Sequence, residues 1–447
     1  MFAPLYTAAE MRAAEAGHPV EVLMERAGAA VATEVVRAFP AVRRVAVVCG
    51  GGANGVDGRI AARVLREAGF EAIETDAPEG FDVVVDALLG TGFHGNVRPA
   101  TAVLIERINA CGAPVVAVDL PSGIDASTGE VRGPAVRADL TVTFHGPKVG
   151  LAVAPGRFGV GVVVVADLGL EPAPTRARRV TEGLLAGVPL RGAADTKRTA
   201  GHVVVVGGSP GLTGAAVLAA RAAFRADAGY VTLCVPAASL AAAEVLAVEP
   251  VKIGFRGAEE ALAAAVDAGA VALGPGLGRS EKAIGLARTL LEQLDVPVVV
   301  DADALLALVP GARRVPTVIT PHAGEAARLL GWTVDKVQAR RLEAAATLAE
   351  RFGAVVVLKG ADTIIQAPGA GPLIADYGPP SLATAGTGDV LTGIIAAFLA
   401  KGMEPAHAAA AGAVAHGLAA ASLPHRAGVI ASDVAEALPG VLDRHAR

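Results

Sequence analysis

Short valine-rich runs alternate with helical segments along most of the chain, and this alternation is the strongest constraint on its fold. The predicted strands of the first half are Val45–Cys49, Glu71–Thr75, Val83–Ala87, Val115–Val118, Leu140–Phe144 and Val162–Ala166. Those of the second half are His202–Gly207, Tyr230–Val235, Ala270–Leu273, Val298–Val300, Val318–Ile319 and Val355–Leu358. Helices are expected between them, for example over Ile60–Ala68, Ala102–Ala110 and Ala215–Ala226. Such alternation predicts α/β domains of three layers, each a mostly parallel sheet covered by helices on both faces.

The length of 447 residues is typical of two domains, and one stretch interrupts the alternation. Residues 171–195 contain Pro- and Arg-rich segments without apolar periodicity. We therefore expect domains at 1–170 and 196–447, joined by a linker over 171–195. The two halves share architecture but show no sequence repeat.

Composition excludes several classes of protein. Hydrophobic residues make up 53% of the chain and the net charge is −5, with no long basic run, which argues against nucleic acid or an anionic membrane as a partner. Three scattered cysteines without metal-ligand spacing indicate buried thiols in a reducing compartment. The first 20 residues contain charged side chains, so no signal peptide is expected, and the uncharged stretch Pro405–Leu423 fits a buried helix better than a membrane span. We expect a cytoplasmic protein.

The most informative single motif is AGTGDVLTG at residues 385–393, which is followed directly by an apolar helical segment. Glycines beside the first turn of a helix let backbone N–H groups surround an anion, assisted by the helix dipole. A carboxylate at Asp389 would repel a phosphate unless it takes part in the chemistry, for example as a base that deprotonates an attacking hydroxyl. The alternative is that Asp389 is only the N-cap of the helix.

Five other strand ends of the second half carry small or polar residues that the fold would bring to the same edge. They are GGSPGLTGAA (207–216), GPGLG (274–278) with DADAL (301–305), TPHAGE (320–325) and KGADT (359–363). Tight packing explains the glycine loops equally well, and helix capping explains at least one aspartate of DADAL. His322 and Lys359 are sharper indications, because both follow strands and face the expected edge.

In the first half, GGGANGVDG (50–58) satisfies the dinucleotide fingerprint G-x-G-x-x-G, with Glu74 and Asp76 at a suitable distance for a ribose contact. Asp57 argues against that interpretation, because it would lie near a pyrophosphate without a partner. A redox dinucleotide site remains an open alternative.

DALLGTG (86–92) and DLPSG (119–123) follow two further strands. Asn54, Asp86 and Ser122 can converge there as oxygen ligands of one hard cation. Asp119 is a candidate acid/base, with Lys148 from the loop FHGPKVG as its helper, although Asp119 can also cap a turn and Lys148 can be solvated.

These motifs give residues 1 to about 170 a clear resemblance to the NAD(P)HX epimerase (YjeF N-terminal) family, which has a Rossmann-like fold. The resemblance implies a potassium ion held by Asn54, Asp86 and Ser122, with Asp119 and Lys148 as catalytic residues. It also implies substrate contacts from Asn54, Asp57, Gly90 and Gly92. The glycine loop departs from the family pattern G-N-G-N-N-G-G-D-G at three positions, Gly51, Ala53 and Val56.

Residues from about 196 to 438 closely resemble the ADP/ATP-dependent NAD(P)HX dehydratase family, which has a ribokinase-like fold. The resemblance implies Asp389 as the base and substrate contacts from Ala216, Gly276 and His322. The implied nucleotide-binding residues are Lys359, Gly360, Ala361, Asp362, Thr363, Gly386 and Gly388. The usual H-K-G-x-x-G opening reads TKRTAG here, with Thr196 in place of histidine.

Both resemblances in one chain, in this order, indicate the fused bifunctional repair family. Its members interconvert the R and S hydrates NADHX and NADPHX and dehydrate the S form. The resemblance implies K⁺, Mg²⁺ and ADP as phosphoryl donor, and a homo-oligomer. Two alternatives stay open: a ribokinase-like small-molecule kinase with an N-terminal nucleotide-binding regulatory domain, and a first half that serves only as a sensor or interaction module.

Overall fold

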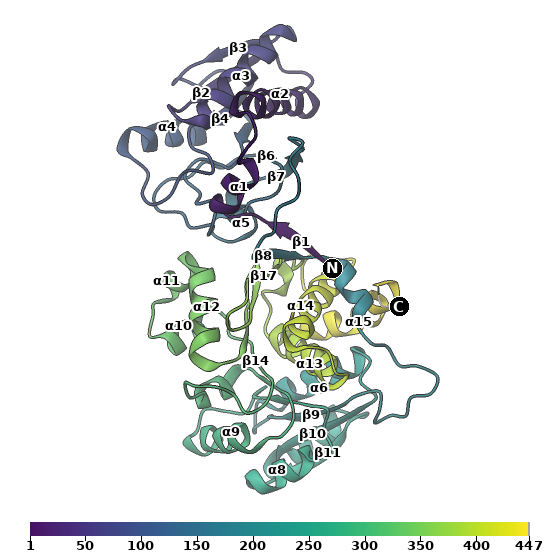
Figure 1. Cartoon of the computed structure of the whole chain (residues 1–447). Coiled ribbons are helices and arrows are strands. Elements are labelled where there is room, and N and C mark those ends of the chain that lie inside the picture. The colour runs from purple at the N-terminus through teal and green to yellow at the C-terminus, as the bar shows by residue number, and fades with distance from the viewer. Residues whose placement is uncertain (446–447) are drawn as a thin grey trace. The chain divides into compact units, whose positions relative to one another are not determined.

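The computed structural model describes residues 1–445, which form two compact units (Figure 1). The smaller unit comprises Pro4–Arg178 together with Gln338–Arg340. The larger unit comprises Met1–Ala3, Arg179–Val337 and the chain from Arg341 onward. The two α/β series of the sequence therefore fold separately.

The smaller unit contains a parallel sheet of six strands in the order β3-β2-β4-β5-β6-β7. Its strands are β2 (Arg44–Cys49), β3 (Glu71–Glu74), β4 (Val83–Ala87), β5 (Val115–Val118), β6 (Leu140–Phe144) and β7 (Val162–Ala166). Its helices are α1 (Ala8–Glu15), α2 (Val20–Ala38), α3 (Ala53–Glu67), α4 (Pro99–Ala110) and α5 (Val149–Ala152).

Alternate residues of these strands are buried on opposite faces of the sheet. Val45 and Val47 pack with α2 and α3 in one core, whereas Ala46 and Val48 pack with α4 in another. Because successive side chains of a strand point to opposite faces, the near-continuous valine runs belong to a sheet that is covered twice. This confirms the predicted three-layer arrangement of the first half.

The larger unit contains a sheet of eleven strands in the order β1-β8-β17-β16-β15-β14-β13-β12-β9-β10-β11. The central strands are parallel, and β15, β16 and β17 are antiparallel to one another in turn. The strands are β1 (Phe2–Leu5), β8 (Ala177–Val180), β9 (His202–Val206), β10 (Tyr230–Pro236), β11 (Val251–Phe255), β12 (Ala270–Leu273), β13 (Val298–Val300), β14 (Thr317–Ile319), β15 (Val355–Leu358), β16 (Thr363–Gln366) and β17 (Leu373–Ala375).

Ala-rich helices cover one face of this sheet, and their small side chains permit close packing on the valines of β9 to β15. These helices are α6 (Thr213–Arg225), α13 (Thr387–Ala400), α14 (Pro405–Ala421) and α15 (Ala431–His445). The remaining helices are α7 (Leu240–Leu246), α8 (Ala258–Ala265), α9 (Glu281–Gln293), α10 (Ala323–Leu330), α11 (Val334–Ala339) and α12 (Arg341–Phe352), of which α7, α8 and α12 contact strands of the sheet. Helix α14 is buried along most of its length, as the sequence predicted.

Two segments differ from the sequence-based expectation. Helix α3 begins at Ala53 rather than near Ile60, so most of the expected glycine loop, from Ala53 to Gly58, is helical. The stretch expected as a linker contains β8 and a 3₁₀ helix at Glu182–Gly187. Val180, Leu184 and Leu185 there are buried in the core of the larger unit, and burial of these apolar side chains orders the segment.

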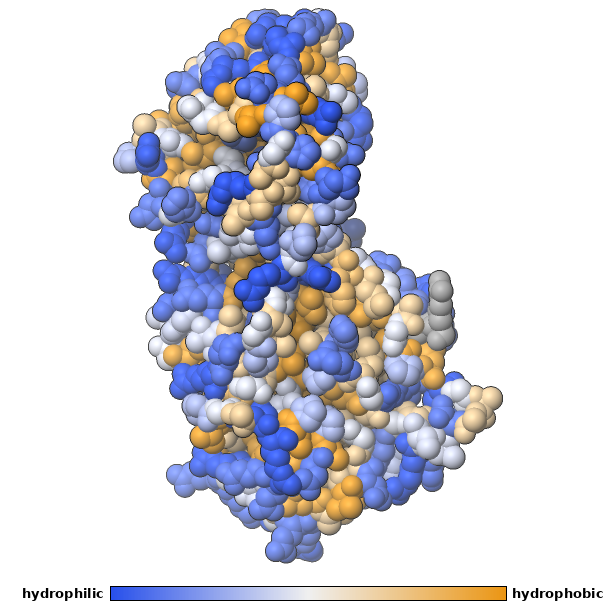
Figure 2. Space-filling model, in the orientation of Figure 1, coloured by the Kyte–Doolittle hydropathy of each residue, from blue (hydrophilic) through white to orange (hydrophobic). Residues whose placement is uncertain are grey.

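Hydrophilic and hydrophobic residues are interspersed over the face of each unit shown in Figure 2. Among the described residues, no helix combines the length and apolar character needed to cross a lipid bilayer.

Candidate active sites

The smaller unit has a cleft of about 990 Å³ at the carboxyl ends of its central strands. The loop after β2 (Gly50–Gly52), the loop after β4 (Leu88–Gly92), Asp119 beyond β5 and Glu15 of α1 all line it. Parallel strands end at one edge of the sheet, which explains why motifs far apart in the sequence meet here.

Asp119 and Lys148 form a buried ion pair in this unit. The Lys148 Nζ lies 2.5 Å from Asp119 Oδ1, and the two side chains are 1% and 8% exposed. The ammonium also donates to the Thr143 hydroxyl and the Phe144 carbonyl, each at 3.0 Å, so Lys148 is fully engaged and not solvated. Asp119 has φ of +66°, a conformation that non-glycine residues rarely adopt and that is frequent at functional sites.

Asn54 and Ser122 both contact the backbone of Leu89, and Ser122 links this backbone to Asp86. The fully buried Asp86 accepts hydrogen bonds from the Ser122 hydroxyl at 2.6 Å and the Ser122 N–H at 2.8 Å. The Ser122 oxygen in turn accepts from the Leu89 N–H at 2.9 Å, and the Asn54 amide donates to the Leu89 carbonyl at 3.1 Å.

This cluster offers one carboxylate and neutral oxygens from an amide, a hydroxyl and a carbonyl. Burial raises the pKa of Asp86 to about 6, because the charged carboxylate loses its hydration there, although the hydrogen bonds from Ser122 oppose the shift. Oxygen donors suit a hard cation, and a single carboxylate matches a single positive charge. The residues therefore fit a monovalent cation such as K⁺.

Asp57 lies in the cleft with an unsatisfied carboxyl group. It is 8% exposed, and its Oδ1 has no hydrogen-bond partner among the described residues. Burial, followed by the charges of Asp119 and Glu15, raises the pKa of Asp57 to about 8. Asp57 is therefore mostly protonated at neutral pH.

The remaining first-half predictions also map to this cleft. Gly90 and Gly92 line it, as do Gly51 and Ala53, two positions where the chain departs from the family's Asn-rich pattern. Neither Gly51 nor Ala53 can offer a side-chain amide to a ligand. Glu74 is ion-paired with Arg59 at 3.2 Å, which argues against its proposed contact to a ribose.

In the larger unit, α13 begins at the glycine motif. Gly386 has φ of +91° and is the N-cap, so the interpretation of Asp389 as the N-cap is wrong. Asp389 occupies the third position of the helix and is partly buried. Burial, followed by the nearby Asp301 carboxylate, raises the pKa of Asp389 to about 7, although the Lys359 ammonium opposes the shift. A carboxylate of this pKa is suited to accept a proton near neutral pH.

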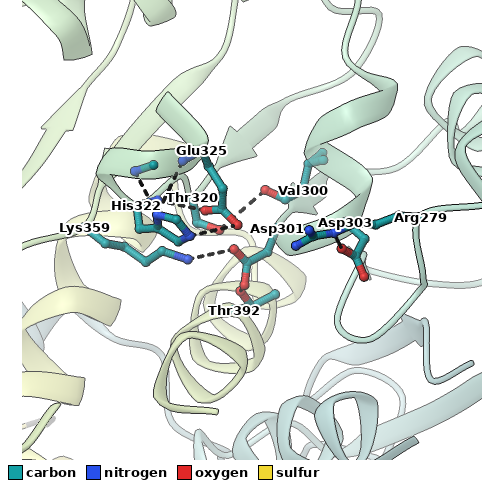
Figure 3. A network of polar contacts seen from close by, with 10 residues as sticks. Arg279, Val300, Asp301, Asp303, Thr320, His322, Glu325, Lys359 and Thr392 are labelled. Carbon is teal, nitrogen blue, oxygen red and sulfur yellow. Dashed lines mark hydrogen bonds and ion pairs between the residues drawn. The ribbon is translucent and has the colours of Figure 1, made fainter. Parts of the chain in front are cut away.

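Figure 3 shows the polar network beside this turn. Lys359 Nζ lies 2.8 Å from Asp301 Oδ1, and the Thr392 hydroxyl donates to Asp301 Oδ2 at 2.7 Å (Figure 3). A Cβ placed on Gly388 would lie 3.3 Å from the Lys359 Nζ, so the ammonium rests against the start of α13. We call Asp301, Lys359, Asp389 and Thr392 the α13 cluster.

The aspartates of DADAL do not cap a helix through their side chains, contrary to expectation. Asp301 makes no side-chain cap of the 3₁₀ helix Ala302–Ala307, and Asp303 instead accepts from the Gly278 N–H at 3.0 Å and from Arg279 at 2.7 Å. Asp303 thereby fixes the loop that contains Gly276, whose φ of +61° requires glycine.

His322 is the N-cap of α10. Its Nδ1 accepts from the Gly324 N–H at 2.9 Å, while the Glu325 carboxylate accepts from the His322 N–H at 2.8 Å (Figure 3). Because Nδ1 is an acceptor, the proton of the neutral ring resides on Nε2. The side chain is 58% exposed, so a ligand can reach it.

Two residues predicted to contact ligands, Asp362 and Ala216, have buried side chains. Asp362 is buried and paired with Arg341 at 3.1 Å, so its carboxylate holds the β15–β16 loop together and does not face a ligand. The Ala216 side chain is fully buried beneath Gly208. Gly360 and Ala361, in contrast, are exposed.

Sequence reasoning missed Thr392 and His416. Thr392 lies within the glycine motif, but nothing in its spacing indicated a bond to Asp301. His416 of α14 hydrogen bonds to the backbone of Thr387, and burial lowers its pKa to about 4. It is thus neutral beneath the first turn of α13.

Comparison with known families agrees with this geometry. Residues 203–439 match the NAD(P)H-hydrate dehydratase family, and residues 20–79 and 70–150 match the YjeF-related protein N-terminus family. The bifunctional NAD(P)H-hydrate repair enzyme Nnr of Moorella thermoacetica is 39% identical over 513 residues, which cover 98% of this chain and 96% of that protein. The Escherichia coli protein of the same name is 36% identical over 466 residues, covering 94% and 89%.

Solved structures match the larger unit. An ADP/ATP-dependent NAD(P)H-hydrate dehydratase from Bacillus subtilis, co-crystallised with ATP and Mg²⁺, has a TM-score of 0.54 and 30% identity, covering 59% of this chain and 97% of its own. A ribokinase-like superfamily protein from Enterococcus faecalis has a TM-score of 0.55 at 25% identity, covering 62% and 99%. The predicted α/β class with Rossmann-like and ribokinase-like domains is confirmed. Family matches in both halves and full-length relatives lead to one assignment: the chain belongs to the bifunctional NAD(P)H-hydrate repair enzyme family.

Proposed function

We propose that the chain restores hydrated NAD(P)H through two activities, an epimerase in the smaller unit and an ADP-dependent dehydratase in the larger one. The observation that carries the proposal is Asp389, a carboxylate of raised pKa at the glycine-lined start of α13, beside the ammonium of Lys359. The family assignment favours this function over a small-molecule kinase with a regulatory domain.

In the dehydratase, Asp389 takes the proton from the C6 hydroxyl of the hydrate while the hydroxyl oxygen attacks the terminal phosphoryl group of ADP. The bond from that phosphorus to the bridging oxygen breaks, and AMP leaves. The ring nitrogen then expels phosphate from C6, and loss of the C5 proton restores the dihydronicotinamide ring.

Several groups of the larger unit have proposed roles around this step. Backbone N–H groups of Gly386–Gly388 and the Lys359 ammonium stabilise the phosphoryl charge, and the exposed Gly360 and Ala361 approach the nucleotide together with Thr363. His322 donates from Nε2 to the hydrate, and Ala216 and Gly276 shape the surface on which it lies. Mg²⁺, when bound with the nucleotide, would neutralise part of the phosphate charge.

In the epimerase, Asp119 takes the C6 hydroxyl proton as the C6–N1 bond opens, and Lys148 stabilises the resulting charge distribution. Protonated Asp57 gives a proton to the ring nitrogen, and closure on the other face yields the opposite epimer. Asn54, Asp86 and Ser122 would hold K⁺, which would fix the loops around the substrate. Gly90 and Gly92 have no side chain and permit close approach of the substrate.

The test is the full chain with mixed-epimer NADHX, ADP and Mg²⁺, followed by NADH absorbance and by AMP and phosphate release. We expect the three products in equal amounts, and Asp389→Asn should retain less than about 1% of the rate while still binding ADP. A stable phosphorylated product would instead establish the kinase alternative. Replacing ADP with ATP in the same assay tests the proposed preference for ADP.

We also propose a cytoplasmic location and a homo-oligomer. Cys49, Cys111 and Cys234 are free thiols, which suits a reducing compartment. Val245 and Val248 are each 82% exposed near the edge strand β11, which suits association with a second copy. Fractionation and light scattering test these two points.

A further inference from the structure

We propose that Asp301 is a positioning residue of the dehydratase: together with Thr392 it holds the Lys359 ammonium against the start of α13, where the phosphoryl group is transferred. The inference rests on the proposed function of the larger unit and adds to it a residue whose role the sequence left open.

The geometry restricts Asp301 to one orientation. It follows β13, its side chain is 2% exposed, and both carboxylate oxygens are engaged, one by Lys359 at 2.8 Å and the other by Thr392 at 2.7 Å (Figure 3). Thr392 is itself fully buried on α13, one turn beyond Asp389. The carboxylate is therefore fixed relative to the helix that carries the proposed base.

Lys359 differs from a purely structural lysine in its exposure. Its side chain remains 20% exposed although its Nζ is ion-paired, and a Cβ on Gly388 would lie 3.3 Å from that nitrogen and 4.0 Å from Asp301 Oδ2. The ammonium and the first backbone N–H groups of α13 thus face the same region. Two positive features converging there suit a phosphoryl group.

A long lysine side chain loses much rotamer freedom when it is held in place, and a buried ion pair by itself is a poor source of stability. The contact from Asp301 to Lys359 has a functional explanation instead. If the Lys359 ammonium moved by about 1 Å from the reacting phosphoryl group, the rate would fall by up to roughly 100-fold.

The same network acts on Asp389 electrostatically. The charged groups that face Asp389 are Asp301, Asp303 and Glu325, which raise its pKa, and Lys359, which lowers it. His416, from α14, is neutral because its pKa is lowered to about 4. Removing the charge of Asp301 should therefore lower the pKa of Asp389, and removing the charge of Lys359 should raise it.

The experiment compares Asp301→Asn, Thr392→Val and Lys359→Met in the full chain with NADHX and ADP. We expect kcat of Asp301→Asn to fall about 10- to 100-fold with little change in KM for NADHX. In the pH profile of kcat/KM, the acidic limb reports the pKa of Asp389. This limb should move to lower pH in Asp301→Asn and to higher pH in Lys359→Met. Thr392→Val should lower kcat several-fold and leave the limb in place.

The matched control is Asp227→Asn, which breaks another Lys–Asp pair of the larger unit, Lys401 with Asp227 at 2.6 Å. It should lower Tm without moving the pH profile. The inference is overturned if Asp301→Asn leaves kcat and the acidic limb as in the wild type, or if its loss of rate merely follows its loss of Tm as in the control. Absence of NADH formation by the wild type would contradict the proposed function instead.

Discussion

Burial raises the pKa of Asp389 to about 7 in the larger unit and that of Asp57 to about 8 in the smaller unit. A free aspartate has a pKa near 3.9. Keeping a carboxyl group protonated, or nearly so, at neutral pH therefore lowers the folding stability of each unit. Asp57 shows this most clearly, because its Oδ1 has no hydrogen-bond partner in the described part of the chain. Such a cost is expected where the group has a chemical task.

Asp57→Asn should therefore stabilise the smaller unit at alkaline pH. The folded-state pKa lies above the unfolded one, so the contribution of Asp57 is favourable below about pH 4 and is lost as the pH rises towards 8, by up to about 1.4 kcal/mol per unit. The amide variant lacks this loss. Thermal unfolding from pH 5 to 9 should show a Tm that exceeds the wild-type value increasingly as the pH rises, whereas the exposed-site control Glu106→Gln should follow the wild type. Parallel curves for Asp57→Asn and the wild type would contradict the assignment.

Among the elements, α13 depends on close approach to α6. A Cβ on Gly393 would lie only 2.1 Å from the backbone carbonyl oxygen of Ala219, and backbone cannot move aside as a flexible side chain can. The glycine thus sets the distance between the helices and, through α13, the position of Asp389.

Gly393→Ala should destabilise the larger unit by about 1–3 kcal/mol or more and reduce dehydratase activity. Gly285→Ala is the control, since Gly285 lies on the exposed face of α9 with open space around it and alanine there should stabilise by about 0.5–1 kcal/mol. Urea unfolding of both variants measures the difference. Equal stabilities would mean that α6 and α13 can separate at little cost.

At the same scale, the strands and the edge on which the site lies were predictable, whereas the contacts of the site were not. Valine runs define β9 or β15 locally, and parallel topology then places the residues that follow β14 and β15, His322 and Lys359, at one edge of the larger unit's sheet. The partner of Lys359 is Asp301, 58 residues away, and the partner of Asp362 is Arg341 on a neighbouring helix. Side-chain pairing depends on packing between elements, which no spacing in the sequence encodes.

The start of α3 illustrates a second limit of the sequence. Glycines in GGGANGVDG predict a loop, but a Cβ on Gly55 would lie 1.9 Å from the carbonyl oxygen of Gly50. The glycine is therefore required by close packing of the first turn of α3 against the preceding loop, and not by a turn of its own. The same residue type serves both purposes, so the boundary was placed seven residues late.

For the whole molecule, the larger unit includes Met1–Ala3 and everything from Arg179 to Val337, so the epimerase-like residues lie between two parts of it in the sequence. A fragment that starts at residue 196 would lack β8 and the buried Leu184 and Leu185. The two activities are therefore better separated by substitution in the full chain than by truncation.

If the two sites share only the freely diffusing hydrate, variants of one site should complement variants of the other. With mixed epimers, Asp119→Ala should convert only the S fraction to NADH, and Asp389→Asn should form almost no NADH but should still interconvert R and S. Mixing the two variants should restore conversion of the whole pool, because the R hydrate epimerised on one chain can be dehydrated on another. Chiral separation of the remaining hydrate, together with NADH absorbance, measures each step. Full conversion by Asp119→Ala alone, faster than the uncatalysed epimerisation, would remove Asp119 from the proposed mechanism, and failure of the mixture would show that the sites act only within one chain.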